Sequence, residues 1–196
     1  MSGSEDNNSR RQPQLSIVTT VDPCAETMAV FVSAVENYAS SRGLALELVV
    51  VDDLGSLPPG QPAWQRDSAM LRMLVLADRR GQGQFRAMLH GVASTSAEVL
   101  VTIDPDMAHN VPDIDHFLAR WRDGKDLVLG WRVRREGTPL ARRLPSWLFN
   151  VLNRLLAGVP IRDNNTPMRL LSRRAADFVL ASGLSPEDCS LHLYAR

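Results

Sequence analysis

Cysteine is scarce in this chain: only Cys24 and Cys189 occur among 196 residues. A disulfide framework or a cysteine-rich metal site is therefore not expected, and a reducing cytosol is the expected compartment. Charge of one sign is also lacking, because 22 basic residues balance 22 acidic ones. This balance argues against a large basic surface and hence against nucleic acid as a partner.

Long apolar runs are absent as well. No stretch approaches the roughly 18 apolar residues that cross a bilayer. Residues 1–14 (MSGSEDNNSRRQPQ) are polar and lack the apolar core of a signal peptide. We therefore predict a disordered N-terminal tail over residues 1–14 and a single domain over residues 15–196. The protein is expected to be cytoplasmic, either soluble or lying on a membrane surface.

Short apolar strands alternate with helices along the chain. Strands are predicted at 15–21, 46–53, 71–77, 98–104 and 126–133, and helices at 25–40, 81–94 and 111–121. A further strand at Met168–Leu171 and a helix follow. The strands are continuous apolar runs, which is typical of a sheet covered on both faces. The predicted fold class is α/β, with an open, mostly parallel sheet flanked by helices.

Acidic residues follow two of these strands where each strand ends. Asp52 and Asp53 close the second, and Asp104 and Asp106 close the fourth, while Arg132 lies just past the apolar part of the fifth. Ligands of open α/β sheets bind at the carboxyl ends of the strands. Two carboxylates at positions i and i+2 of an extended segment point the same way and can share one Mg²⁺ or Mn²⁺. Such a cation keeps positions open for phosphate oxygens.

Each of these features also has a simpler interpretation. The Asp104-Pro105-Asp106 segment, taken alone, is also explained by a solvated turn, since Asp and Pro are common turn residues. Gln82 and Gln84 lie among glycines before the second helix, where a helix N-terminus favours an anion, but the segment lacks the Lys-Ser/Thr of a P-loop.

Six segments of the chain have the character of a known family. They are LSIVTTV, LELVVVDD, GQGQFRAMLHG, EVLVTIDPDMAHN, DLVLGWRVRREG and, most specifically, RRLPSWLFNVLNRLLAGVPIRDNNTPMRLLSRR (142–174). They resemble segments of family 2 glycosyltransferases with the GT-A fold, in particular the dolichol-phosphate mannosyltransferase-like, or polyprenyl-phosphate glycosyltransferase, group. The resemblance covers about residues 15–180.

The resemblance implies a GT-A-like fold and transfer of a sugar, with inversion, from a nucleotide-diphosphate sugar to an acceptor such as a polyprenyl phosphate. It implies a site in which Asp104 and Asp106 hold Mg²⁺ or Mn²⁺ at the diphosphate. The implied donor-binding residues are Asp22, Asp52, Asp53 and Asp104, and the implied catalytic residues are Asp106, Arg132 and Arg169. A lipid phosphate is already an anion, whereas a hydroxyl acceptor needs a general base, for which His109 and Asp163 are the candidates. His109 is also explained as a hydrogen-bonding loop residue.

The chain departs from the family pattern at three places. The first strand ends in Thr20-Val21-Asp22-Pro23-Cys24 instead of a Pro-x-Tyr-Asn-Glu type motif. Leu54 displaces the usual Gly-Ser that follows the Asp pair, and Ala108 stands where the family often has Gln. Two rival functions are therefore considered: a non-catalytic nucleotide-binding module with a degenerate GT-A fold, and a nucleotidyltransferase. The latter would need a glycine-rich, basic loop after the first strand, which this chain lacks.

Residues 139–157 (PLARRLPSWLFNVLNRLLA) form a predicted helix with apolar residues on more than one side. Packing on the domain is one interpretation of this segment. Peripheral contact with an anionic membrane surface, close to a polyprenyl substrate, is the other, because Trp147, Phe149 and several arginines lie among its leucines.

Overall fold

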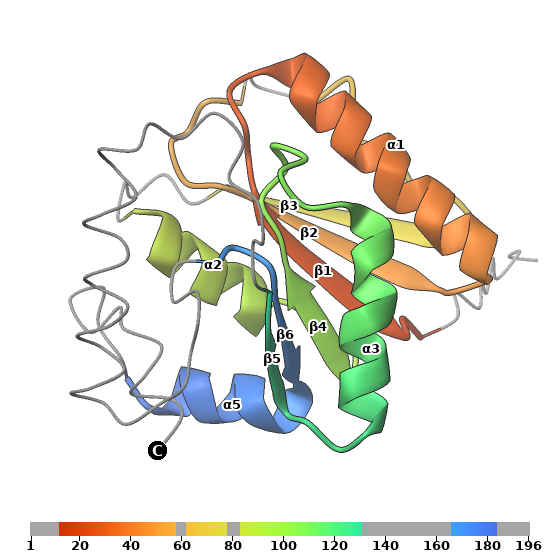
Figure 1. The fold of residues 1–196 in the computed structure, drawn as a ribbon. Helices are drawn as coiled ribbons and strands as arrows, with labels where there is room; N and C mark the ends of the chain where they lie inside the picture. The colour runs from red at the N-terminus through yellow and green to blue at the C-terminus, as the bar shows by residue number, and fades with distance from the viewer. Residues whose placement is uncertain (1–11, 58–61, 78–82, 131–165, 184–196) are drawn as a thin grey trace, which may run out of the picture.

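The computed structural model of the protein describes residues 12–57, 62–77, 83–130 and 166–183. Within these ranges, six strands form one sheet in the order β3-β2-β1-β4-β6-β5 (Figure 1). The strands are β1 Leu15–Thr20, β2 Leu46–Asp52, β3 Leu71–Ala77, β4 Val99–Thr102, β5 Leu127–Leu129 and β6 Arg169–Ser172. The helices are α1 Ala25–Arg42, α2 Gln84–Ala93, the 3-10 turn η1 Val111–Asp113, α3 Ile114–Arg122 and α5 Arg173–Ala181.

The sheet is mostly parallel, as predicted. β1 pairs with β2 and β4 in parallel, and β2 pairs with β3 in parallel. The exception is β6, which lies antiparallel between β4 and β5. The strand itself was predicted from its apolar residues, but its position between β4 and β5 was not. An apolar run shows that a strand is buried without identifying its neighbours.

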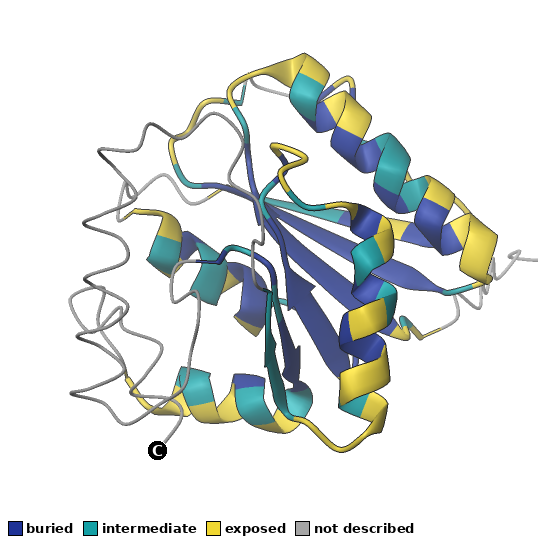
Figure 2. Cartoon of the chain, viewed as in Figure 1, coloured by how far each residue is buried: buried dark blue, intermediate teal, exposed yellow. Residues whose placement is uncertain are grey.

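Both faces of the sheet are covered by helices. On one face, β1, β2 and β4 contribute alternate residues to a core with α1 and α3; on the other face, the intervening residues pack against α2 and α5 (Figure 1). The central strands β1, β2 and β4 are accordingly buried along their length, the edge strands β3 and β5 only in part, while the outer sides of the helices are exposed (Figure 2). Burial on both faces is the reason that the strands read as continuous apolar runs.

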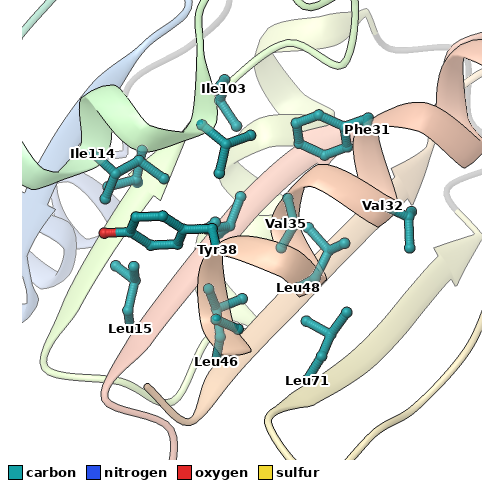
Figure 3. Close-up of a cluster of buried hydrophobic side chains, with 14 of the residues drawn as sticks. Leu15, Phe31, Val32, Val35, Tyr38, Leu46, Leu48, Leu71, Ile103 and Ile114 are labelled. Carbon is teal, nitrogen blue, oxygen red and sulfur yellow. The ribbon is translucent and has the colours of Figure 1, made fainter. Parts of the chain in front are cut away.

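The core under α1 contains most of the large buried side chains. Phe31, Val35 and Tyr38 of α1 lie over Leu46 and Leu48 of β2, close to Ile103 and Ile114 (Figure 3). α1 is joined to α3 by polar contacts: the Tyr38 hydroxyl donates to Asp115 Oδ1 at 2.8 Å, and Arg42 Nε donates to Asp115 Oδ2 at 3.1 Å. The hydrogen bond from Arg42 holds the pKa of the Asp115 carboxyl below its usual range. Burial, and then the bond to Asp115, raise the pKa of the Tyr38 phenol.

On the opposite face, α2 lies close to the sheet because Gly91 has no side chain. A Cβ at Gly91 would lie 2.4 Å from Val18 Cγ1 and 3.0 Å from Val51 Cγ2. Both valines are fully buried. The glycine therefore fixes the distance between α2 and strands β1 and β2, and with it the position of the first turn of α2.

The loop before β4 is held from two sides. Glu47, buried in β2, accepts hydrogen bonds from Ser16 Oγ at 2.8 Å and from the backbone and hydroxyl of Ser96 at 2.9 and 3.1 Å.

From the other side of this loop, Arg173 donates to the carbonyl oxygens of Thr95 and Ala97. Charged residues at the start of a helix are commonly solvated, but the side chain of Arg173 is not, because the loop offers it carbonyl acceptors that are distant in the sequence.

Most predicted elements are confirmed, with differences at their ends. The fourth strand ends at Thr102 rather than Asp104, whereas the second helix begins at Gln84, directly after the two glycines that open residues 81–94. The predicted helix at 139–157 lies outside the described residues, as do most of the predicted tail and the C-terminal end of the predicted domain, so their limits stay predictions. Among the described residues, no helix combines the length and apolar character that a bilayer span requires.

Candidate functional site

Three strands bring their carboxyl ends to one edge of the sheet. Thr20 of β1 is level with Val51 of β2, and Val18 of β1 is level with Thr102 of β4. Beyond these positions the backbone N–H of Val21 still donates to Val51 O, and that of Ile103 to Val18 O. The segments that follow β1, β2 and β4 therefore leave the sheet side by side. They carry Asp22, Asp52 with Asp53, and Asp104 with Asp106.

The segment after β4 is a turn. Pro105 is buried, Asp104 is half-buried and Asp106 is exposed. Asp106 Oδ1 accepts the backbone N–H of Ala108 at 2.9 Å, and Met107 between them has a φ of 57°. The expectation that the two aspartates project alike from an extended strand is therefore wrong in its geometry. The strand ends two residues before Asp104, and the turn separates the environments of the two carboxylates.

The donor set at this turn fits a hard divalent cation. Asp104 and Asp106 supply carboxylate oxygens, which Mg²⁺ and Mn²⁺ prefer. Within the ranges that the structure describes, no group of three or more His, Cys, Asp or Glu side chains could enclose a metal. A cation here would rest on one or two protein carboxylates and complete its shell with phosphate oxygens and water, as Mg²⁺ commonly does.

The two aspartates at the end of β2 have different environments. Asp52 is buried, with 3% of its surface exposed. Its Oδ1 accepts from the backbone and hydroxyl of Ser56 at 2.9 and 3.1 Å, and its Oδ2 accepts from the backbone of Leu57 at 3.0 Å. Asp53 is half-buried at the start of this loop. Both oxygens of Asp52 thus serve the loop, and Asp53 is the better placed of the pair to meet a ligand.

Asp22 shapes the start of α1. Its Oδ1 accepts the backbone N–H of Cys24 at 2.7 Å, and its own N–H points to Met28 Sδ at 3.3 Å. Cys24 is the exposed N-cap residue of α1. Hydrogen bonds from Thr27 lower the pKa of the Cys24 thiol. The first-strand segment that departs from the family pattern therefore has a defined turn of its own at the edge of the site.

Arg169 opens β6 at the same edge. In the antiparallel pairing it lies opposite Thr102 of β4, two residues before Asp104 in the chain. It is half-buried. The predicted phosphate-binding arginine and the predicted metal-binding turn are thus brought together by the insertion of β6 beside β4. Arg132 and Asp163, the other predicted residues of the site, lie outside the described residues.

Gln84 joins this group through a direct contact. Its side-chain Nε2 donates to Asp104 Oδ1 at 3.0 Å. The sequence had indicated Gln84 only as a residue able to contact phosphate at a helix N-terminus. Its pairing with Asp104 spans 20 residues, and no local pattern reveals such a contact. His109, the candidate base, is half-buried in the loop after Asp106.

A match to a known protein family shows which kind of protein has this sheet edge. The family described as "Glycosyl transferase family 2" matches residues 16–180. The chain belongs to this family. The match includes every aspartate of the edge and Arg169, and it confirms the resemblance stated from the sequence.

Two curated relatives of this glycosyltransferase family 2 chain act on polyprenyl phosphates by name. The dodecaprenyl-phosphate galacturonate synthase of Rhizobium johnstonii is 27% identical over 161 residues, which cover 80% of this chain and 47% of the relative. The undecaprenyl-phosphate 4-deoxy-4-formamido-L-arabinose transferase of Pseudomonas aeruginosa is 30% identical over 143 residues, covering 71% and 41%. The chain thus spans about half the length of these relatives or less.

The fold is also found among solved structures. The mannosyltransferase of Pyrobaculum calidifontis, in complex with GDP-Man and Mn²⁺, superposes with a TM-score of 0.54 at 18% identity. The match covers 86% of this chain and 47% of that one. This likeness confirms the GT-A-like fold that the sequence predicted.

Proposed function

We propose that this chain transfers a sugar from a nucleotide-diphosphate sugar to an acceptor, in a reaction that depends on Mg²⁺ or Mn²⁺. The observation that carries the proposal is the convergence of Asp104, Asp106, Asp53 and Arg169 on one edge of a family 2 sheet. This is the edge at which open α/β sheets bind ligands. A nucleotidyltransferase would need a glycine-rich, basic loop after the first strand, which this chain lacks. A non-catalytic module would share this edge, and the transfer assay below separates it from the enzyme.

The residues of this edge have separate tasks in the proposal. Asp104 and Asp106 hold the divalent cation beside the diphosphate of the donor. Asp53 and Asp22 meet the nucleoside at the ends of β2 and β1, and Asp52 supports them by closing the loop that carries Asp53. The bound cation supplies charge neutralisation for the departing nucleoside diphosphate.

Two arginines supply positive charge to the proposed site. Arg169 is presented by β6 opposite the end of β4, so its guanidinium can bind a phosphate on the acceptor side of the turn. Arg132 is proposed for the same task from the segment after β5. If the acceptor is a phosphate, its oxygen is already anionic near neutral pH, and the site needs no strong base.

The acceptor that we propose is a polyprenyl phosphate. The names of both relatives support this choice. A lipid acceptor requires the protein to work at a membrane surface, and we propose peripheral contact on the cytoplasmic side. Flotation with liposomes that contain anionic lipid tests this part: the protein should float with the vesicles at low salt. Recovery of all protein in the buffer fraction at every salt concentration would exclude it.

The transfer itself is tested with labelled UDP- and GDP-sugars, undecaprenyl phosphate in detergent, and Mn²⁺. The expected result is a labelled lipid product whose anomeric configuration is opposite to that of the donor. Asp106→Ala should reduce the rate at least 100-fold, since it removes a ligand of the cation. Asn37→Ala, which changes an exposed amide on α1, should have no effect. Binding of nucleotide without transfer to any acceptor would favour the non-catalytic module instead.

A further inference from the structure

The amide of Gln84 contacts the first aspartate of the proposed metal site. Gln84 Nε2 lies 3.0 Å from Asp104 Oδ1. A neutral amide donor leaves the full negative charge on the carboxylate while it restricts rotation of the side chain. Hydrogen bonds of this kind orient the carboxylates that bind metals, and their loss weakens metal binding.

The amide is presented from a rigid element. Gln84 is the first residue of α2, which is packed on β1 and β2 through Gly91 without room for a Cβ. Asp104 belongs to the turn after β4, next to β1 in the sheet. The contact therefore ties the turn to a helix whose position is set by the core, and this is the arrangement that holds a site in its productive geometry.

The helix also contributes through its backbone. The N-terminus of an α-helix carries a partial positive charge that favours a nearby anion. Because the partner of Asp104 is the first residue of α2, the carboxylate lies by this end of the helix. Gly83, the N-cap residue, has no side chain that would compete for the position. Both effects favour a single orientation of the Asp104 carboxylate at this end of the helix.

We infer that Gln84 is a positioning residue, which orients Asp104 for the divalent cation and thereby sets the affinity for the metal–nucleotide complex. This inference rests on the proposed function, because it assumes that Asp104 binds the cation. It adds a residue from α2 to a site that is otherwise built from the ends of strands and the segments that follow them.

The experiment is calorimetric titration of Mn²⁺ into the protein with saturating UDP or GDP, whichever the wild type binds. Gln84→Met keeps the length of the side chain and removes the N–H donor, so Mn²⁺ should bind about tenfold more weakly. Gln84→Ala should give a similar loss. Without metal, in EDTA, the melting temperature of Gln84→Met should stay within about 2 °C of the wild type, since Gln84 is exposed.

Two reference variants make the outcome decisive. Asp104→Ala should abolish Mn²⁺ binding, and Asn37→Ala should match the wild type. If Asp104→Ala loses the metal while Gln84→Met binds it as the wild type does, the inference is overturned and the proposed function stands. A lower melting temperature in EDTA with unchanged Mn²⁺ affinity would also overturn it, since the role would then be structural. If the wild type binds no Mn²⁺ with either nucleotide, the proposed function fails, and the inference fails with it.

Discussion

Ser56 donates two hydrogen bonds to one oxygen of Asp52, from its backbone N–H at 2.9 Å and from its hydroxyl at 3.1 Å. The other oxygen of Asp52 accepts the backbone N–H of Leu57 at 3.0 Å. A buried carboxylate at the end of β2 therefore closes the loop that begins with Asp53. In the sequence the two aspartates look equivalent, but the structure gives them different neighbours, and different consequences should follow from their removal.

Asp52→Ala should destabilise the protein by about 2 kcal/mol, because it removes a buried carboxylate that accepts from exposed Ser56 and half-buried Leu57. Nucleotide affinity should fall as well, since Asp53 loses its support. Asp53→Ala is the matched variant: its stability should stay within about 0.5 kcal/mol of the wild type, while its nucleotide affinity falls. Urea unfolding and calorimetry measure the two quantities. Equal stability of the two variants would contradict the assignment of the loop-closing role to Asp52.

Arg173 and Arg174 are adjacent, but their replacement by alanine should have very different effects on the stability of the protein. Arg173 donates to Thr95 Oγ1 at 2.8 Å and to Ala97 O at 2.7 Å, so Arg173→Ala should lower the free energy of unfolding by about 2 kcal/mol. Arg174 is paired with Asp126, but 82% of its side chain is exposed, and Arg174→Ala should change stability much less than Arg173→Ala does. Urea denaturation of both variants checks this. Arg173→Lys should recover only part of the loss, because a single ammonium cannot reproduce the fork of donors.

The close packing of α2 on the sheet predicts that replacing Gly91 by alanine lowers the stability of the protein. Alanine normally stabilises a helix by about 1 kcal/mol relative to glycine. At Gly91, however, the new Cβ would lie 2.4 Å from Val18 Cγ1, so Gly91→Ala should destabilise by about 1–3 kcal/mol. Ala93→Ser, at an exposed position of the same helix, serves as the control and should have little effect. A Gly91→Ala variant that unfolds at higher urea than the wild type would show that α2 does not approach β1 this closely.

The contact of Asp115 with Arg42 and Tyr38 predicts a dependence of stability on pH. The pKa of Asp115 is lower in the folded protein than the value of about 3.9 for an unfolded chain. The contribution of ionised Asp115 to the free energy of unfolding is therefore fully present above pH 4. It is lost as the pH falls through the folded-state pKa of this carboxyl. Asp115 and Arg42 are 40% and 47% exposed, so the contribution should be only about 0.5 kcal/mol.

Urea unfolding at pH 7 and near pH 2 tests this contribution. Asp115→Asn should be less stable than the wild type at pH 7, and the difference should shrink toward pH 2. Asp123→Asn is the control, because its pairing with Arg120 is longer, at 3.8 Å, and more exposed. A difference between Asp115→Asn and the wild type that is independent of pH would show that the charge of Asp115 has no part in holding α1 to α3.

The local pattern of the sequence determined the elements of this protein. The strands were predictable because helices cover both faces of the sheet, which favours runs of apolar and β-branched residues in the strands. The helices were predictable from the spacing of residues such as Met28, Phe31 and Val35. The edge of the site was also predictable, since acids that follow parallel strands must lie at the same end of the sheet.

Tertiary structure alone decided which of these residues meet. The insertion of β6 beside β4 brings Arg169 opposite Thr102, and the packing of α2 brings Gln84 to Asp104. The separate roles of Asp52 and Asp53, and of Arg173 and Arg174, depend on which acceptors or donors the neighbouring loops present. The spacing of apolar residues in the sequence indicates which side chains are buried, because the buried side of a helix or strand recurs at the period of that element. A hydrogen bond between distant residues follows from the packing of whole elements, and this chain carries no local sign of it.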